Sequence, residues 1–413
     1  MKYLAGISIF LLMLKTNAQE KNSPFLKDLL WTHASPLLKT ILSNPDSFRY
    51  QIIYTRIDRN RKNEPEFSNY FLRVNKDQYF NPASTVKMPL AFLALEKIDE
   101  LKKYGIDLNT TMLTDSSYSA QTKVDRDSSS ADQLPSIAQY IKKIFLVSDN
   151  DAYNRLYEFL GQQFINERLW QLGYKDIRIT RRFTPMDEDQ NRHSNQIRFI
   201  NGNQLLYKQA PAFNKDSFDF SKKIFIGKAH YNFKDSLILA PMDFTRHNNF
   251  PLEDLQNVLQ SVLFPQSVSA NQRFRLTEND YHFLLQYMSE YPSESHFPHY
   301  DISTYFDSYA KFFMFKSGKT PIPSYIRIFN KPGWSYGFLT DVAYIVDFKN
   351  KVEFMVSATI YVNSDGILND DKYEYDETGY PFFKEVGNII YQYELDRKRN
   401  YRPNLKRFQL KYY

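Results

Sequence analysis

The chain has 413 residues and a net charge of +6, and it contains no cysteine. The lack of cysteine excludes disulfides, thiol catalysis, zinc–thiolate sites and anchoring through a lipidated cysteine. The positive charge is modest and spread along the sequence, so we expect no nucleic-acid partner. With 34 Phe and 31 Tyr, the chain is long and apolar enough for one large catalytic domain.

The first eighteen residues have the pattern of an export signal. Lys2 precedes an apolar run over 4–14, and 16–18 offers small residues for cleavage before Gln19. The apolar run is too short to span a bilayer. We therefore expect a signal peptide over 1–18, a mature domain over 19–413, and a periplasmic protein without stable membrane insertion. An uncleaved anchor is the alternative.

The first motif of chemical interest is an S-x-x-K sequence formed by Ser84 and Lys87, followed by an apolar run over 88–95. That run predicts a buried helix. Residues three apart at a helix start lie on one face, so Lys87 can take the proton of Ser84 if burial lowers the lysine's pKa. Pro89 cannot donate to the carbonyl of Thr85, which predicts an irregular first turn.

S-x-x-K alone is a weak signal, because a capping serine and a solvated lysine give the same spacing. Ser308 and Lys311 form a second match in an aromatic, Asp-rich stretch with no other catalytic motif nearby. We interpret this second copy as structural.

The second motif, Ser148-Asp149-Asn150, lies between helical patterns over 134–147 and 152–160. All three residue types are favoured at helix N-caps, so capping is the ordinary interpretation. The position of the motif downstream of the S-x-x-K sequence, at the head of a helix, favours a functional role. Its serine can serve as a proton shuttle.

The third motif, Lys331-Pro332-Gly333, lies within a strand pattern that starts at Tyr325 and continues to Gly337. A cation and a glycine on a strand can bring positive charge and backbone N–H groups close to a ligand, although a turn is the alternative. Lys316-Ser317-Gly318 is a rival that we reject, because prolines interrupt the chain directly after it. Three motifs in this order are typical of a serine acyl-transfer enzyme that works without histidine.

The order of motifs resembles the penicillin-recognising serine enzymes, above all class A β-lactamases and their Bacteroidetes-type relatives, over about 49–395. The resemblance implies an α/β (α+β) fold of the β-lactamase/transpeptidase type. An antiparallel sheet from about 45–80 and 322–413 would pack against a helical lobe over about 81–321, with an insertion at about 183–240. The matching patterns are an opening hairpin (49–58 and 67–74), closing strands (327–362) and a final helix (387–394). The gap from Ser148 to Lys331 is far longer than the family's. The extra length includes two strand-like runs (197–207 and 222–239), which we interpret as the insertion, before helical periodicity resumes (241–263).

The resemblance also implies how an acyl-enzyme would form. Ser84 would attack the substrate carbonyl, with Lys87 as its base. Ser148 would relay a proton to the departing nitrogen. No metal and no organic cofactor is expected.

The remaining roles implied by the resemblance concern substrate binding. Asn150 would bind the amide side chain of the substrate, and Lys331 would hold Ser148 and the substrate carboxylate electrostatically. Gly333 would bring the strand close to the substrate. The backbone N–H groups of Ser84 and Trp334 would form the oxyanion hole.

Two departures from the family pattern matter. Pro332 stands where the family carries a threonine or serine whose hydroxyl helps to bind the carboxylate. The stretch 178–185 has no carboxylate where class A enzymes place a deacylating glutamate. The acidic residues 187–189 could substitute for it, although a solvated acidic loop is the ordinary interpretation. Without a deacylating base, the acyl-enzyme would persist.

The sequence therefore predicts a monomeric periplasmic serine hydrolase that acts on β-lactams or related amides through Ser84, with a role in the response to antibiotics. The expected partner is a small-molecule substrate, either a β-lactam or a peptidoglycan peptide. The alternatives are a D-alanyl-D-alanine peptidase or esterase, and a non-catalytic penicillin-binding sensor.

Overall fold

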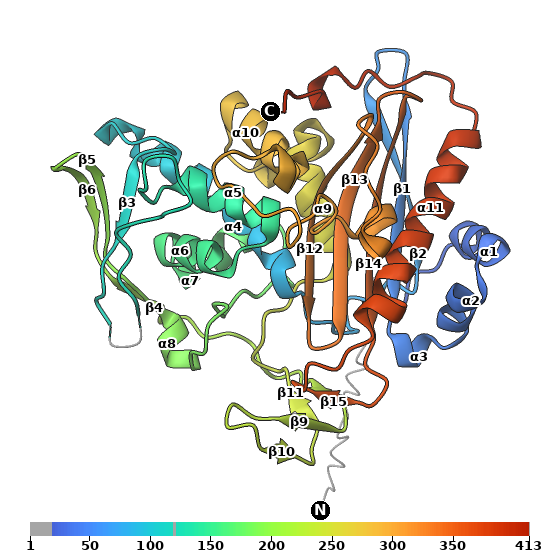
Figure 1. Ribbon diagram of the computed structural model, residues 1–413, viewed down its shortest axis with the longest axis horizontal. Coiled ribbons are helices and arrows are strands. Elements are labelled where there is room, and N and C mark those ends of the chain that lie inside the picture. The colour runs from blue at the N-terminus through green and yellow to red at the C-terminus, as the bar shows by residue number, and fades with distance from the viewer. Residues whose placement is uncertain (1–18, 119–120, 413) are drawn as a thin grey trace, which may run out of the picture.

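The computed structural model describes residues 19–118 and 121–412 (Figure 1). The predicted signal peptide over 1–18 lies outside the described residues. None of the helices within those described ranges is long and apolar enough to cross a membrane.

A five-stranded antiparallel sheet, in the order β12-β13-β14-β1-β2, organises the fold (Figure 1). Strands β1 (Gln51–Arg59) and β2 (Pro65–Leu72) come from the N-terminal part of the chain. Strands β12 (Ile326–Ser335), β13 (Phe338–Asp347) and β14 (Val352–Tyr361) come from the C-terminal part, and β1 pairs with β14. The predicted sheet built from both ends of the chain is confirmed.

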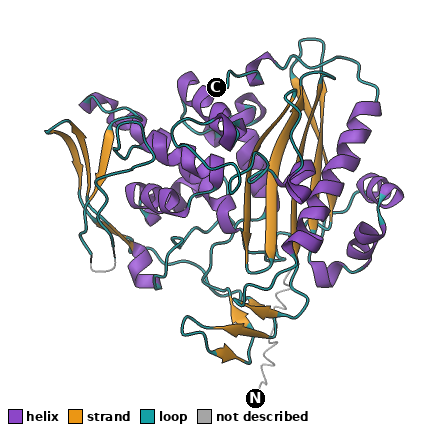
Figure 2. Ribbon diagram, viewed as in Figure 1, coloured by secondary structure: helices purple, strands orange, loops and turns teal. Residues whose placement is uncertain are grey.

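Helices cover both faces of this sheet, as Figure 2 shows. On one face, α1 (Pro24–His33), α2 (Pro36–Ser43) and α11 (Tyr380–Asp396) share an apolar core with the strands. On the other face, α9 (Leu252–Leu263) and α10 (Glu278–Ser289) join the sheet to the helical lobe. Because both faces are covered, β13 and β14 are buried along their whole length. The α+β fold predicted from the sequence is therefore confirmed.

The helical lobe is built around α4 (Lys87–Leu101), which is buried from its first residue to Glu96. Helices α5 (Ile137–Val147) and α6 (Asn150–Leu160) pack against it, and α7 (Gln162–Gln171) follows. A 3₁₀ turn precedes α4. This irregular start confirms the effect expected of Pro89, which withholds one backbone donor from the first turn.

The segment between α7 and α9 forms short peripheral strands. Strands β5 (Ile197–Asn201) and β6 (Gln204–Gln209) form a hairpin where the sequence predicts a strand-like run over 197–207, and β5 pairs with β3 (Thr111–Thr114). Strand β9 (Ala229–Tyr231) lies at the centre of a second small sheet, between β10 and β15. The other short elements are α3 (Pro45–Phe48), α8 (Glu188–Arg192), β4 (His193–Ser194), β7 (Ala212–Phe213), β8 (Phe225–Ile226), β10 (Leu237–Ile238), β11 (Met242–Asp243) and β15 (Ile367–Leu368).

The helical periodicity predicted from residue 241 is wrong at its start. Residues Met242–Asp243 form β11, which pairs with β8, and the Asp243 carboxylate accepts the N–H of Thr245 at 2.8 Å. Such a side-chain bond to the nearby backbone competes with helix formation. Helix α9 therefore begins only after Pro251.

Candidate active site

Ser84 lies in the 3₁₀ turn Ala83–Val86, where α4 meets the edge strand β12. The turn is fixed by its own side chains: Asn81 Oδ1 accepts the N–H of Ala83 at 2.9 Å, and Pro82 O accepts the Thr85 hydroxyl at 2.6 Å. Ala83 has a φ of 44°, a conformation that costs energy in a residue other than glycine. Ser84 is only 9% exposed. The serine is thus held on a strained, well-bonded turn, as functional residues often are.

Gly333 lets β12 pass directly beside this turn. A Cβ at position 333 would lie 2.7 Å from Ser84 N and 2.8 Å from Pro82 O, so no larger residue fits without moving backbone. Trp334 follows on the same strand. The two residues expected to supply the oxyanion hole, Ser84 and Trp334, therefore come from segments in direct contact.

Lys87 is completely buried and its ammonium faces the second motif. Its Nζ donates to Asn150 Oδ1 at 2.6 Å, to Ser148 Oγ at 3.4 Å and to the Ser148 carbonyl. Burial lowers the pKa of Lys87 to about 7, and the nearby charge of Asp149 partly opposes that shift. About half of the lysine is then the free base at neutral pH. Among the described residues, no hydrogen bond joins Lys87 to Ser84.

Ser148 is the residue at which α5 ends, and it lies at the centre of the site. Its φ of 63° is left-handed, and its hydroxyl accepts from Lys331 Nζ at 2.8 Å as well as from Lys87. The capping role belongs to its neighbour, since Asp149 accepts the N–H of Ala152 at 2.7 Å at the start of α6. Asp149 therefore caps α6, and the Ser148 hydroxyl makes its contacts with the two lysines.

Lys331 is buried on β12 and donates to Pro332 O at 2.8 Å in addition to Ser148. Burial and the positive charges of Lys87 and Lys311 lower the pKa of Lys331 well below its usual range, against the opposing charge of Asp341. The structure thus brings together the predicted residues of all three motifs. Pro332 lies between Lys331 and Gly333 and has no hydroxyl with which to bind a carboxylate.

An aromatic ring, and not a carboxylate, covers Lys87 from the loop between α7 and α8. Lys87 Nζ lies 4.8 Å from the ring centroid of Phe183. The Phe183 N–H donates to Asn154 Oδ1 at 2.8 Å, and its ring packs against Tyr153 with centroids 4.7 Å apart. Sequence reasoning missed Phe183, because nothing in a lone loop phenylalanine indicates which lysine it will cover.

The acidic residues that follow this loop are engaged elsewhere. Asp187 caps α8, Glu188 pairs with Arg246, and Asp189 lies 3.6 Å from His193. Among the contacts of the described residues, none links these three carboxylates to Lys87 or Ser84. Their partners are those of a structural loop, and the geometry does not favour them as a deacylating base.

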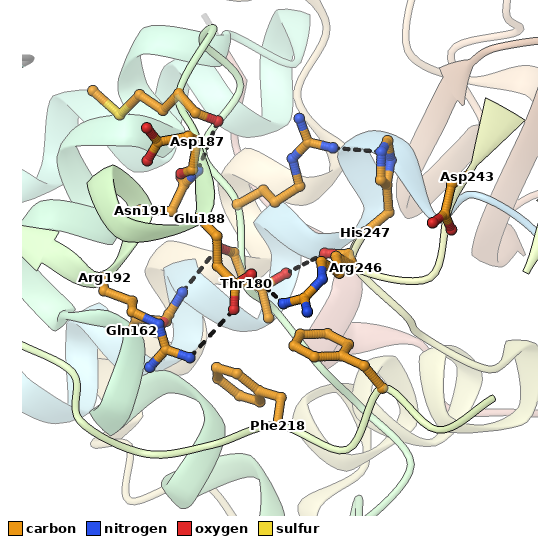
Figure 3. Close-up of a pocket in the computed structure, with 13 residues that line it drawn as sticks. Gln162, Thr180, Asp187, Glu188, Asn191, Arg192, Phe218, Asp243, Arg246 and His247 are labelled. Atoms are coloured by element: carbon orange, nitrogen blue, oxygen red, sulfur yellow. Dashed lines mark hydrogen bonds and ion pairs between the residues drawn. The ribbon is translucent and has the colours of Figure 1, made fainter. Parts of the chain in front are cut away.

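A cavity of about 220 Å³ lies behind the same loop and not at Ser84 (Figure 3). Its charged residues are already paired: Arg181 contacts His247, and Arg192 and Arg246 contact Glu188. The cavity is lined by Gln162, Thr180, Arg181, Met186, Asp187, Glu188, Asn191, Arg192, Phe218, Phe220, Asp243, Arg246 and His247. It contains none of the three motifs, so its size alone does not make it the active site.

The second S-x-x-K copy turns out to lie close to the site. Lys311 is 1% exposed, and its Nζ donates at 2.8 Å to Oδ1 of Asn330, the residue before Lys331. The interpretation that nothing catalytic lies near this copy is therefore wrong for Lys311, although Ser308 stays structural. The rejected rival Lys316 packs under aromatic rings, 4.3 Å from the centroid of Tyr309, outside any strand.

Residues 41–206 match the family model described as the β-lactamase enzyme family. No curated protein matches the sequence. A β-lactamase structure from Xanthomonas campestris pv. campestris is 13% identical, with a TM-score of 0.49, over 88% of this chain and 98% of that one. An ancestral class A β-lactamase is 14% identical, with a TM-score of 0.46, over 86% and 98%. The structure of PBP-A is 14% identical, with a TM-score of 0.45, over 92% and 98%.

Proposed function

We propose that this chain, whose residues 41–206 match the model of the β-lactamase enzyme family, is a divergent member of that family and a serine hydrolase that forms an acyl-enzyme on Ser84. The substrate class that we propose is a β-lactam or a related amide. The observation that carries the proposal is the position of the Ser148 hydroxyl, which lies 2.8 Å from Lys331 Nζ and 3.4 Å from Lys87 Nζ, next to the turn that bears Ser84.

We propose a closed path for the proton, in which the hydrogen bond between Lys87 and Ser148 supplies one link. The Ser84 oxygen bonds to the substrate carbonyl carbon while its proton passes to neutral Lys87. The C–N bond then breaks as Ser148 gives its proton to the nitrogen, and Lys87 returns the proton to Ser148, to which it is already hydrogen-bonded. The backbone N–H groups of Ser84 and Trp334 stabilise the oxyanion, and loss of one such donor typically costs about 3–4 kcal/mol.

A second candidate, penicillin binding without efficient turnover, is favoured by one observation. Phe183 covers Lys87 at 4.8 Å on the side of the α7–α8 loop, so that loop offers no carboxylate beside the lysine to activate water. An ester on Ser84 would then be hydrolysed slowly. We propose that acylation is fast relative to deacylation, which would suit a penicillin-binding peptidase or sensor as well as a slow β-lactamase.

Export to the periplasm is proposed on the sequence pattern of 1–18 alone. N-terminal sequencing of the protein recovered from a periplasmic fraction tests it. A mature chain that starts at Gln19 supports the proposal, and a chain that keeps the apolar run over 4–14 favours the uncleaved anchor.

Intact-protein mass spectrometry after incubation with a penicillin tests the acyl-enzyme. We expect an adduct of the drug's full mass on Ser84, and no adduct on the Ser84→Ala variant. Ser308→Ala, which removes the serine of the second S-x-x-K copy, serves as the matched control and should label normally. An adduct that moves to Ser308 would contradict the site, and the lifetime of the adduct separates binding from turnover.

The rate of acylation is expected to depend on the charge of Lys87. The folded pKa is about 7, lowered by burial, and only the neutral amine accepts a proton. The rate should therefore rise about tenfold per pH unit below pH 7 and level off above it. Stopped-flow labelling with a chromogenic cephalosporin between pH 5 and 8 measures this profile, and a rate that is flat across that whole range would exclude Lys87 as the base.

A further inference from the structure

A third buried lysine lies behind the two that contact Ser148. Lys311 joins Lys87 and Lys331, and all three are at most 1% exposed. Lys311 Nζ donates to Met288 O at 2.6 Å and to Asn330 Oδ1 at 2.8 Å. Both acceptors are uncharged. The mechanism above gives Lys311 no role, although burying a lysine without a direct anionic partner is costly.

Asn330 connects this lysine to a buried carboxylate. Its Nδ2 donates to Asp341 at 2.8 Å and 3.0 Å, and the N–H of Phe312 donates to the same carboxylate at 3.1 Å. Asp341 lies opposite Pro332 in the β12–β13 register, so it shares a sheet face with Asn330, while Lys331 points to the other face. The row of Lys311, Asn330 and Asp341 therefore runs directly behind Lys331.

The charged groups around Lys331 come from several elements. Lys87 faces it from α4, Ser148 bonds to it from the α5–α6 junction, Lys311 lies behind β12, and Asp341 lies on β13. The two other lysines disfavour a charge on Lys331, and Asp341 favours one. At low dielectric such interactions act over several ångströms, so exchanging either neighbour changes the charge on Lys331.

Two charged groups act on Lys311 from farther out, with opposite signs. Arg327 and Glu294 form an ion pair of 2.7 Å and act on Lys311 with opposite signs. Burial lowers the pKa of Lys311 to about 7 and raises the pKa of Asp341 to about 6.

We propose that Lys311 and Asp341 are positioning residues that set the charge of Lys331 from behind β12, and thereby decide whether the site can hold an anionic group of the substrate. This inference rests on the proposed function, in which Lys331 is the anion anchor. A substrate carboxylate beside Lys331 supplies negative charge to a cluster of three lysines and one aspartate. Binding of an anionic substrate then draws a proton onto Lys331.

Lysine side-chain NMR of the full protein, with ¹³C at Cε, tests the inference without any substrate. The Lys331 resonance is assigned from the signal that is lost in Lys331→Arg. Lys311→Met removes a positive neighbour and should move the Lys331 titration midpoint to higher pH. Asp341→Asn removes the negative neighbour and should move it to lower pH. Shifts of the Lys331 midpoint in opposite directions would support the inference, because a general disturbance of the structure would not follow the sign of the deleted charge.

Two further variants keep the test decisive. Lys311→Gln keeps a hydrogen-bond donor but removes the charge, and it replaces Lys311→Met if that variant does not fold. Lys311→Arg keeps the positive charge, so its Lys331 titration midpoint should match that of the wild-type protein. Lys97→Met is the matched control, because Lys97 is a partly buried lysine, bonded to the carbonyl of Phe159, with no role in the site. Unchanged midpoints, or equal shifts in the Lys311 and Asp341 variants, would overturn the inference.

A kinetic readout separates this inference from the proposed function. With an anionic penicillin, loss of the Lys331 charge should end the plateau of the acylation rate in an alkaline limb, where the rate falls. This limb should move to higher pH in Lys311→Met and to lower pH in Asp341→Asn. At a fixed pH on that limb, the rate should change about tenfold for every pH unit by which the limb moves. A wild-type protein that never labels would contradict the proposed function only. The NMR midpoints would then still decide the role of Lys311 and Asp341.

Discussion

Replacing Lys87 by methionine is expected to slow acylation of Ser84 by about 10²–10⁴-fold, which is the usual contribution of a positioned general base. Methionine fills the same buried space but cannot accept a proton, and it leaves Asn150 Oδ1 and the Ser148 carbonyl without their donor. The proton path from Ser84 to Ser148 is then broken at its middle step. The rate of adduct formation, followed by rapid-quench mass spectrometry, measures the loss.

Lys97→Met, on the same helix, separates the loss of a base from the loss of a buried charge. Lys97 lies 4.5 Å from the ring centroid of Phe159, and burial lowers its pKa to about 8. Its replacement should leave the acylation rate within about twofold. If Lys87→Met acylated as fast as the Lys97 variant, another group would have to be the base, and Lys331 would be the first to test because it also contacts Ser148.

The motifs were predictable because local sequence carries them. Each motif consists of a few neighbouring residues whose types indicate its chemistry: the S-x-x-K spacing, the 148–150 sequence and the glycine at 333. The order of the motifs along the chain predicts the fold that brings them together. An irregular start of α4 was expected from Pro89. At the motifs and at the start of α4, the local conformational preference of the residues agrees with the tertiary structure. The sequence therefore predicts these features correctly.

The surroundings of the motifs were not predictable in the same way. Phe183 covers Lys87 from 96 positions away, and Lys311 reaches Asn330 across a loop with no recognisable pattern. No periodicity or residue spacing in the sequence indicates either contact. The start of α9 was misplaced for a local reason, since the side-chain bond of Asp243 to the backbone of Thr245 competes with a helical pattern.

Adding a single methyl group at Gly333 is expected to reduce acylation by about 100-fold or more, although position 333 takes part in no chemical step. The new Cβ would lie 2.7 Å from Ser84 N, 2.8 Å from Pro82 O and 2.9 Å from Thr85 N. All three are backbone atoms of the turn that holds the nucleophile, so relief of the clash must displace Ser84 or β12. A displacement of about 1 Å is enough to cost about 10²-fold in rate.

The Gly333→Ala protein should still fold, because overpacking of this kind costs about 1–3 kcal/mol of unfolding free energy. Thermal unfolding and the rate of penicillin labelling, measured on the same sample, distinguish a displaced nucleophile from an unfolded chain. Ser335→Thr adds one methyl group two residues further along β12, at a half-buried position, and should change neither quantity much. A Gly333→Ala variant that labelled at the wild-type rate would show that β12 can move away from the turn, and that Ser84 does not depend on the close packing of this strand for its position.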